Sequence, residues 1–285
     1  MLPISVIIPT MGVRNLKPTL DSLSNGSHAP GEILLCVSTS NAQLIQKYCR
    51  ENIKIIECSN MGQVIQRIEG FKRARYDFVL QLDDDIILDY KCLSVLYESI
   101  LYLGDDCATS PQYFDTVSGK HSSSFSPKKI LLFPKLFYYL LNGKNGFIDG
   151  KISKSGLNMG VSELNDKYYL SDWLPGGCIL HHKENLILKN YLPFKGKAYA
   201  EDVIHSYYLK KSNVKLYVIS KAKIYMNCYN NSTNYLNSFF EYINSIKFSY
   251  YAASLYGSNY LRYRICMYYY LINLTIIKIF KISQD

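Results

Sequence analysis

The stretch Phe78–Leu88 constrains this chain more than any other part of the sequence. A short apolar run with strand character ends at three consecutive carboxylates, Asp83, Asp84 and Asp85, and apolar residues resume at once. Adjacent negative charges repel one another, so water or cations must neutralise them. Hard divalent cations such as Mg²⁺ and Mn²⁺ bind carboxylates together with substrate phosphates. The triplet is therefore either a solvated acidic turn or a cation site at the end of a strand.

Strands and helices alternate through the first ninety residues. The apolar patterns predict strands at residues 4–8, 32–37, 53–57 and 78–82, and helices at 16–23, 42–49 and 61–74. Such alternation predicts right-handed βαβ units, and therefore an α/β fold with a mostly parallel sheet flanked by helices. Ligands of these sheets bind beyond the carboxyl ends of the strands, where the acid triplet falls. The first part of the chain thus has the pattern of a Rossmann-like nucleotide-binding half.

The composition narrows the class of partner and the compartment. The formal net charge of +9 over 285 residues suits an anionic partner, such as a nucleotide diphosphate, a phospholipid surface or a nucleic acid. Eight cysteines without a C-x-x-C pair indicate free thiols in a reducing cytosol. The first nine residues lack a basic region followed by a full apolar region, so a signal peptide is not expected. These features predict a cytoplasmic protein.

Five pieces of sequence, in this order, resemble the family 2 glycosyltransferases, which have the GT-A fold. They are Ser5–Thr10 with Glu32–Leu35, Asn60–Gln63 with Arg67, the D-x-D-like acids at 83–85, the glycine motif Asp172–Cys178 and the E-D motif Tyr199–Val203. The resemblance covers residues 4–226. It implies a GT-A domain over residues 1–233 and a C-terminal helical appendage over residues 234–285.

The resemblance also implies a reaction. A sugar would pass from a nucleotide-diphosphate donor, expected to be a UDP-sugar, to a hydroxyl of a saccharide or lipid-linked saccharide, with inversion at the anomeric carbon. Asp83 and Asp85 would hold Mn²⁺ or Mg²⁺ against the donor phosphates. Asp202 would be the general base for the acceptor hydroxyl. The alternative for Asp202 is structural, because an acid in the first turn of a helix also favours the helix dipole.

Further site residues follow from the same resemblance. Donor binding is assigned to Pro9, Thr10, Arg14, Ser38, Asn60, Gly62, Arg67, Asp83 and Asp84. Acceptor binding is assigned to Trp173, Gly176, Gly177 and Glu201. The glycines would let the backbone approach a ligand closely. Against these roles stand ordinary ones: a core position for the tryptophan, a simple turn for the glycines, and surface ion pairs for the arginines.

Two departures from the family pattern affect these assignments. Relatives often have an aspartate after the second strand that contacts uracil, whereas this chain has Val37-Ser38-Thr39-Ser40. Ser38 or Thr39 would have to contact the base instead. Many relatives also have a metal-binding histidine after the last core strand, and Ile224–Asn227 contains none. The third metal ligand therefore stays open.

The tail has a different character from the rest of the chain. Its last apolar segment, Ile265–Lys278, is slightly short for a membrane-spanning helix, which needs about 20 apolar residues. Tyrosines flanked by Arg262 and Arg264 are typical of a helix lying on an anionic membrane surface. This predicts a peripheral contact with the inner face of the cytoplasmic membrane. The alternatives are a helix pair packed on the catalytic domain, or the interface of a homodimer.

By analogy with relatives, the setting would be bacterial surface-polysaccharide biosynthesis. The expected partners are a nucleotide-sugar donor and a saccharide or lipid-linked acceptor, with no nucleic acid. One competing class is a nucleotidyltransferase acting on a sugar phosphate, which needs a glycine-rich basic loop after the first strand. Residues 9–14 supply only one glycine. The other is a non-catalytic, membrane-associated protein that binds a nucleotide-sugar.

Overall fold

The computed structural model describes residues 1–122, 135–164, 166–192, 198–227 and 235–279. Its contacts divide the chain into two compact units. Unit 1 comprises residues 1–122 and 163–232, and unit 2 comprises residues 123–162 and 233–285. The second unit therefore joins a segment from the middle of the chain to the C-terminal helices, a pairing that the predicted boundary at residue 233 does not include.

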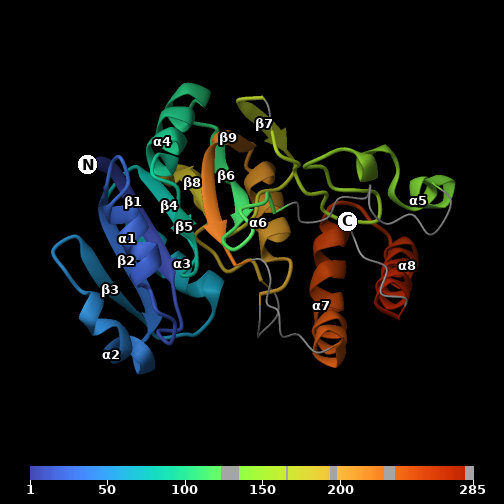
Figure 1. Ribbon diagram of the computed structural model, residues 1–285, viewed down its shortest axis with the longest axis horizontal. Coiled ribbons are helices and arrows are strands. Elements are labelled where there is room, and N and C mark those ends of the chain that lie inside the picture. Colours follow the sequence, from blue (N-terminus) through green and yellow to red (C-terminus); the bar gives the residue numbers. More distant parts are fainter. Residues whose placement is uncertain (123–134, 165, 193–197, 228–234, 280–285) are drawn as a thin grey trace. The chain divides into compact units, whose positions relative to one another are not determined.

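Unit 1 is an α/β unit built on one sheet (Figure 1). Its first half contains β1 (Leu2–Pro9), α1 (Lys17–Ser24), β2 (Pro30–Ser38), η1 (Thr39–Asn41), α2 (Ala42–Ile45), η2 (Gln46–Tyr48), β3 (Ile53–Cys58), α3 (Gln63–Arg73), β4 (Phe78–Leu82), β5 (Ile87–Leu88) and α4 (Cys92–Leu103). Its second half contains β6 (Cys107–Asp115), β7 (Tyr168–Ser171), β8 (Cys178–His182), η5 (Lys183–Asn185), α6 (Glu201–Lys211) and β9 (Lys215–Met226). The elements predicted for the first ninety residues are confirmed, although the helix predicted at 42–49 divides into α2 and the short turn η2.

The sheet is parallel in its first half and mixed in its second. In the described part of the chain its nine strands have the order β3-β2-β1-β4-β8-β6-β9-β5, and β7 pairs with β9. β3, β2, β1 and β4 run parallel, as βαβ units require, while β8 runs antiparallel between β4 and β6. The antiparallel register places Cys178, the first residue of β8, opposite Leu82, the last residue of β4. Residues just before β8 must therefore lie beside the acid triplet just after β4.

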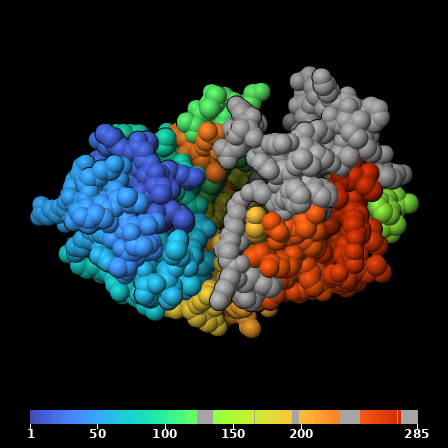
Figure 2. All heavy atoms as spheres, turned by 90° about the horizontal axis from the view of Figure 1, so that it is seen from below, coloured from blue at the N-terminus to red at the C-terminus, as the bar shows by residue number. Residues whose placement is uncertain are grey.

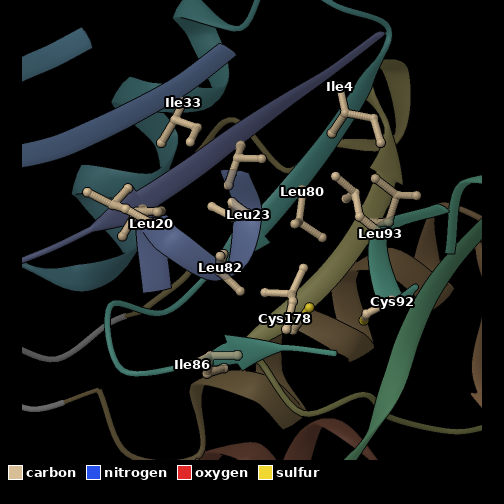
Figure 3. Close-up of a cluster of buried hydrophobic side chains, with 14 of the residues drawn as sticks. Ile4, Leu20, Leu23, Ile33, Leu80, Leu82, Ile86, Cys92, Leu93 and Cys178 are labelled. Carbon is tan, nitrogen blue, oxygen red and sulfur yellow. The ribbon is translucent and has the colours of Figure 1, made fainter. Parts of the chain in front are cut away.

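Helices cover both faces of the parallel half because its strands are apolar on both faces. Ile4, Val6 and Ile8 of β1 point to the face covered by α1 and α4, where Leu20, Leu23 and Leu93 also lie (Figure 3 draws part of this cluster). Ile7 points to the opposite face and packs in a second cluster with Phe71 of α3. The two-residue period of a strand explains this division. The acid triplet thus follows a strand that is held rigidly from both sides.

Unit 2 is helical. It contains α5 (Lys135–Asn142), η4 (Lys144–Phe147), α7 (Tyr235–Leu255) and α8 (Tyr260–Ile279). α7 and α8 form a hairpin whose turn includes Gly257 with φ 80°, a conformation that favours glycine. The loop after η4 packs closely on α7, since a Cβ on Gly156 would lie 2.1 Å from Ala253 Cβ. Among the described residues, no helix is both long and apolar enough to cross a membrane.

The packing of α3 on the sheet makes a prediction about Gly70. A Cβ at this position would lie 2.4 Å from Ile7 Cγ2 and 2.6 Å from Cys36 Sγ. Helix propensity alone predicts that Gly70→Ala stabilises the fold by about 1 kcal/mol. Because α3 cannot move away from β1 and β2 without opening the core, we expect a loss of about 1–3 kcal/mol of unfolding free energy instead, measured by urea denaturation.

Lys72→Ala, on the exposed side of the same helix, is the matched control and should change the unfolding free energy by less than about 0.5 kcal/mol. A Gly70→Ala variant as stable as the natural chain would show that α3 does not pack on β1 and β2 as described.

Candidate active site

The acid triplet lies in the turn between β4 and β5. β1 and β4 are adjacent parallel strands, so the residues that follow them meet at one edge of the sheet. Thr10 donates from Oγ1 to Asp84 Oδ2 at 2.7 Å. Arg14 Nη1 lies 2.9 Å from Asp84 Oδ1 and 2.6 Å from Asp85 Oδ2. Burial raises the pKa of Asp85, and the two neighbouring carboxylates add to this effect against the attraction of Arg14. One guanidinium shared by two carboxylates leaves the triplet with an excess of negative charge.

A fully buried guanidinium connects Asp83, the first acid of the triplet, to the E-D motif. The side chain of Arg67, on α3, is 1% exposed. Its Nη2 lies 2.6 Å from Asp83 Oδ1, and its Nη1 lies 2.9 Å from Glu201 Oε2. Burial alone would lower the pKa of Arg67, but Glu201 and Asp83 outweigh it and raise the pKa. Gln63 also donates to Asp83 Oδ1, at 3.0 Å. Asp83 and Glu201 are therefore held by the same cation.

The glycine pair before β8 fits between these two acids. Arg67 Nη2 donates to the Gly176 carbonyl at 3.1 Å, and the backbone N–H of Asp83 donates to the Gly177 carbonyl at 2.8 Å. A Cβ on Gly176 would lie 2.8 Å from Glu201 Oε2 and 3.5 Å from Asp202 Cβ. A Cβ on Gly177 would lie 3.3 Å from Asp83 Oδ2. A side chain at Gly176 would therefore meet the E-D motif, which shows that the two motifs share one region.

Asp202 and Glu201 differ in environment although they are adjacent. Glu201 is 5% exposed, and it accepts a hydrogen bond from the hydroxyl of Tyr191 as well as the ion pair with Arg67. Asp202 is partly buried; its Oδ1 accepts from the N–H of Val203 at 2.9 Å, and its Oδ2 has no donor among the described residues. Burial, and then the charge of Glu201, raises the pKa of Asp202 to about 7. A carboxylate with this pKa is well matched to accepting a proton near neutral pH.

The other residues assigned from the sequence lie in several places. Pro9 and Ser38 end the parallel strands β1 and β2, and Ser38 Oγ lies 3.0 Å from Ser40 Oγ. Asn60 is exposed, and Gly62 precedes α3 with φ 135°, a conformation that side chains rarely adopt. These residues lie at the same edge of the sheet as the acids, which is consistent with donor binding. Their donor-binding roles stay predictions. Trp173 is 4% exposed and is a core residue in this structure, and its acceptor-binding role likewise stays a prediction.

Sequence reasoning did not assign a role to four side chains that organise the site. Gln63 binds Asp83, and Tyr191 binds Glu201. Gln81 donates to the Gly176 carbonyl, and Tyr113 donates to the Pro175 carbonyl at 3.2 Å. Gln81 could have been noticed as a polar residue inside an apolar strand. The two tyrosines carried no such indication, because Tyr113 is 62 residues from Pro175 and Tyr191 is 10 residues from Glu201, and no helical or strand period relates either pair.

Comparisons with known proteins define the class. The family described as Glycosyl transferase family 2 matches residues 5–153, just over half of the chain. A crystal structure of GalNAc-T7 with UDP, GalNAc and Mn²⁺ is similar over 78% of this chain and 43% of that chain, with 17% identity and a TM-score of 0.56. The structure of S. aureus TarS residues 1–349 is similar over 79% of this chain and 60% of that one, with 17% identity and a TM-score of 0.50. No curated protein matched the sequence.

The fold is the GT-A fold of glycosyltransferases. The chain belongs to glycosyl transferase family 2. The matched part of this chain covers less than two thirds of either solved structure named above. At 17% identity these structures show the fold, and what they bind is a property of those proteins.

The burial of Arg67 makes a prediction about stability. Arg67→Met would leave Asp83 and the buried Glu201 without their shared cation. We expect a loss of about 3–5 kcal/mol of unfolding free energy in urea denaturation, because an unpaired buried charge is costly. Arg14→Met, which removes the exposed guanidinium from the same acid triplet, should cost about 0–1 kcal/mol. Equal losses of unfolding free energy in the two variants would contradict the prediction that the buried arginine matters more for stability than the exposed one.

The raised pKa of Asp202 makes a prediction about pH. An aspartate in the unfolded chain has a pKa near ~3.9, so between about pH 4 and pH 7 the folded chain binds more protons than the unfolded chain. This group therefore lowers the unfolding free energy as pH rises through that range. Asp202→Asn removes the effect, so the variant should gain stability relative to the natural chain as pH rises from about 4 to about 7, and the gain should level off above it.

Urea denaturation across this pH range measures the difference. Asp21→Asn, which changes an exposed carboxylate on α1 paired with Lys17, is the control. Two results would show that Asp202 is an ordinary solvated carboxylate. In one, the stability gain of Asp202→Asn over the natural chain does not grow with pH; in the other, the gain of Asp21→Asn grows as much.

Proposed function

We propose that this protein is an inverting glycosyltransferase that moves a sugar from a nucleotide-diphosphate sugar, expected to be a UDP-sugar, to a hydroxyl of a saccharide or lipid-linked saccharide. The observation that carries the proposal is the glycine pair, which touches the acid triplet through Gly177 and the E-D motif through Gly176. An inverting displacement needs the leaving diphosphate and the incoming hydroxyl to lie on opposite sides of one sugar ring. The position of the glycine pair between two acidic groups supports such an arrangement.

The residues on the donor side fit a divalent cation. Asp83 Oδ1 is occupied by Arg67 and Gln63, and Asp85 Oδ2 by Arg14, but the other oxygen of each carboxylate has no donor in the described part of the chain. No group of three or more His, Cys, Asp or Glu side chains among the described residues is arranged to hold a metal. Two carboxylates completed by substrate phosphates are a usual set for Mg²⁺ or Mn²⁺. Asp83 and Asp85 would hold the ion, which supplies Lewis-acid stabilisation of the leaving diphosphate.

The two arginines that pair with the acid triplet have different roles on the donor side. Arg67 cannot turn toward a substrate without leaving Asp83 and Glu201 without their cation. Its role in the proposal is therefore to position Asp83 rather than to bind the donor. Arg14 is half-exposed, and its ion pairs are with Asp84 and Asp85. It can therefore exchange a carboxylate for a donor phosphate at small cost, which supports donor binding by Arg14.

On the acceptor side, the environment separates the roles of two neighbouring acids. Glu201 is held by Arg67 and Tyr191, so its carboxylate is not free to turn toward an acceptor. Asp202 has an oxygen without a donor among the described residues and a pKa raised to about 7. Asp202 thus supports the role of general base, taking the proton of the acceptor hydroxyl as that oxygen attacks. Glu201 orients the helix terminus that presents Asp202.

The biological setting is also part of the proposal. By analogy with relatives, it is surface-polysaccharide biosynthesis on the inner face of the cytoplasmic membrane, with unit 2 making a peripheral contact with that membrane. The tyrosines and arginines of α8 support the membrane contact.

The test is turnover of a donor panel. Purified protein with Mn²⁺ or Mg²⁺, a saccharide acceptor and each of several nucleotide-sugars should release the nucleoside diphosphate, and a chelator should stop the release. Asp202→Asn should lower kcat by about 10²–10⁴-fold while donor affinity stays within about twofold, because the donor does not touch the base. In the natural protein, kcat/KM should rise with pH through about 7, since the base acts when ionised.

Asp21→Asn is again the control and should retain full turnover. Donor binding that needs no divalent ion and survives Asp83→Asn would overturn the metal assignment alone. Release of pyrophosphate from a nucleoside triphosphate and a sugar phosphate would instead identify a nucleotidyltransferase. Donor binding without turnover in any combination would identify a non-catalytic protein.

A further inference from the structure

The face between α7 and α8 carries an open groove of about 360 Å³. This volume is within the range of small-molecule sites. Its lining is mainly apolar and aromatic, and consists of Ile243, Ile246, Tyr260, Tyr263, Arg264, Met267, Tyr268 and Leu271. Figure 2 shows the surfaces of α7 and α8, in orange and red, next to each other. The groove belongs entirely to unit 2, and the proposed glycosyl transfer does not use it.

The floor of the groove is well packed. The side chain of Tyr263 is almost completely buried, and its hydroxyl donates to the Ile246 carbonyl at 3.2 Å, which ties α8 to α7. The ring of Tyr250 lies 5.4 Å from that of Tyr263 and 5.0 Å from that of Tyr260. The hollow is therefore part of the packing of the hairpin and is not produced by a single rotamer.

A cation lies at the edge of this apolar hollow. Arg264 is exposed and lies between Tyr260 and Tyr268, one turn away on each side along α8. Its Nη1 lies 3.1 Å from the Tyr260 hydroxyl, its Nη2 donates to the Tyr268 hydroxyl, and its guanidinium lies 5.3 Å from the centre of each ring. The two tyrosines fix the guanidinium in position but carry no charge that would neutralise it.

The charge of the hairpin selects the occupant. The two helices, residues 235–279, contain four basic residues, Lys247, Arg262, Arg264 and Lys278, and one acidic residue, Glu241. A second copy of the chain, bound through the same face, would bring these like charges together, which is unfavourable. An anionic phospholipid instead offers a phosphate to the guanidinium and a hydrocarbon chain to the apolar hollow. Tyrosine is suited to this boundary because its ring is apolar and its hydroxyl is polar.

We infer that the groove between α7 and α8 binds an acyl chain of an anionic bilayer phospholipid, with the lipid phosphate against Arg264 and the hydroxyls of Tyr260 and Tyr268. This inference rests on the membrane contact proposed above and gives that contact a specific site. It does not depend on the glycosyl transfer, because vesicle binding is measured without a donor or an acceptor.

The test is sedimentation of the full chain with vesicles of phosphatidylcholine, with and without phosphatidylglycerol. We expect binding to the anionic vesicles that weakens at high salt. Arg264→Gln should weaken it by about fivefold, and Ile243→Ser by about tenfold, because one removes the phosphate partner and the other removes an apolar wall of the groove.

Two matched controls separate the groove from general adhesion of the tail. Lys247→Gln removes an equal charge from α7, and Ile272→Ser removes an isoleucine of similar exposure, 48% against 45% for Ile243, but neither residue lines the groove. Each control should change vesicle binding by less than about twofold. Circular dichroism checks that all four variants keep the helical content of the natural chain.

Three results would overturn the inference. The first is an absence of binding to anionic vesicles. The second is equal weakening within each matched pair, which would indicate adhesion of the whole surface. The third is self-association of the natural chain without lipid, measured by sedimentation velocity and lost in Ile243→Ser, which would show that a second copy covers the groove.

Discussion

The ion pairs of Arg67 are the interaction on which the rest of the site depends. A fully buried guanidinium is tolerated only when its charge is compensated, and here Asp83 and Glu201, which are 118 residues apart in the sequence, compensate it. The same guanidinium donates to the carbonyl of Gly176, so three motifs are fixed to one another by one side chain. Because Arg67 extends from a helix packed against the core, the position of both acids is set from inside the fold rather than from its surface.

The antiparallel strand β8 makes this arrangement possible. A sheet that stayed parallel would bring only the ends of successive strands to the ligand edge. The insertion of β8 beside β4 instead brings a strand start to that edge, and with it the glycine pair. Without side chains, these glycines let the carbonyls of residues 176 and 177 serve as acceptors for Arg67 and for the backbone of Asp83. The geometry of the sheet and the chemistry of glycine thus act together.

Adjacent acids in this site have different properties because their surroundings differ. Asp84 is held by Thr10 and Arg14, and Asp85 shares Arg14 and has a raised pKa. Asp83 pairs instead with the buried Arg67. In the E-D motif, pairing keeps Glu201 in place, while burial near that charge raises the pKa of Asp202 to about 7. The acids of each motif are therefore not equivalent, although they are neighbours in the sequence.

The sequence by itself determined the elements and the order of the motifs. The short apolar runs of strands such as Ile4–Ile8, and the helical patterns between them, depend on local chemistry, so they could be predicted. Only the tertiary structure decided that Arg67 pairs inward with two acids, that Tyr113 donates to the Pro175 carbonyl, and that the described residues 135–162 group with the C-terminal helices. These outcomes depend on contacts between residues far apart in the chain, and no local pattern records which partner a buried side chain will meet.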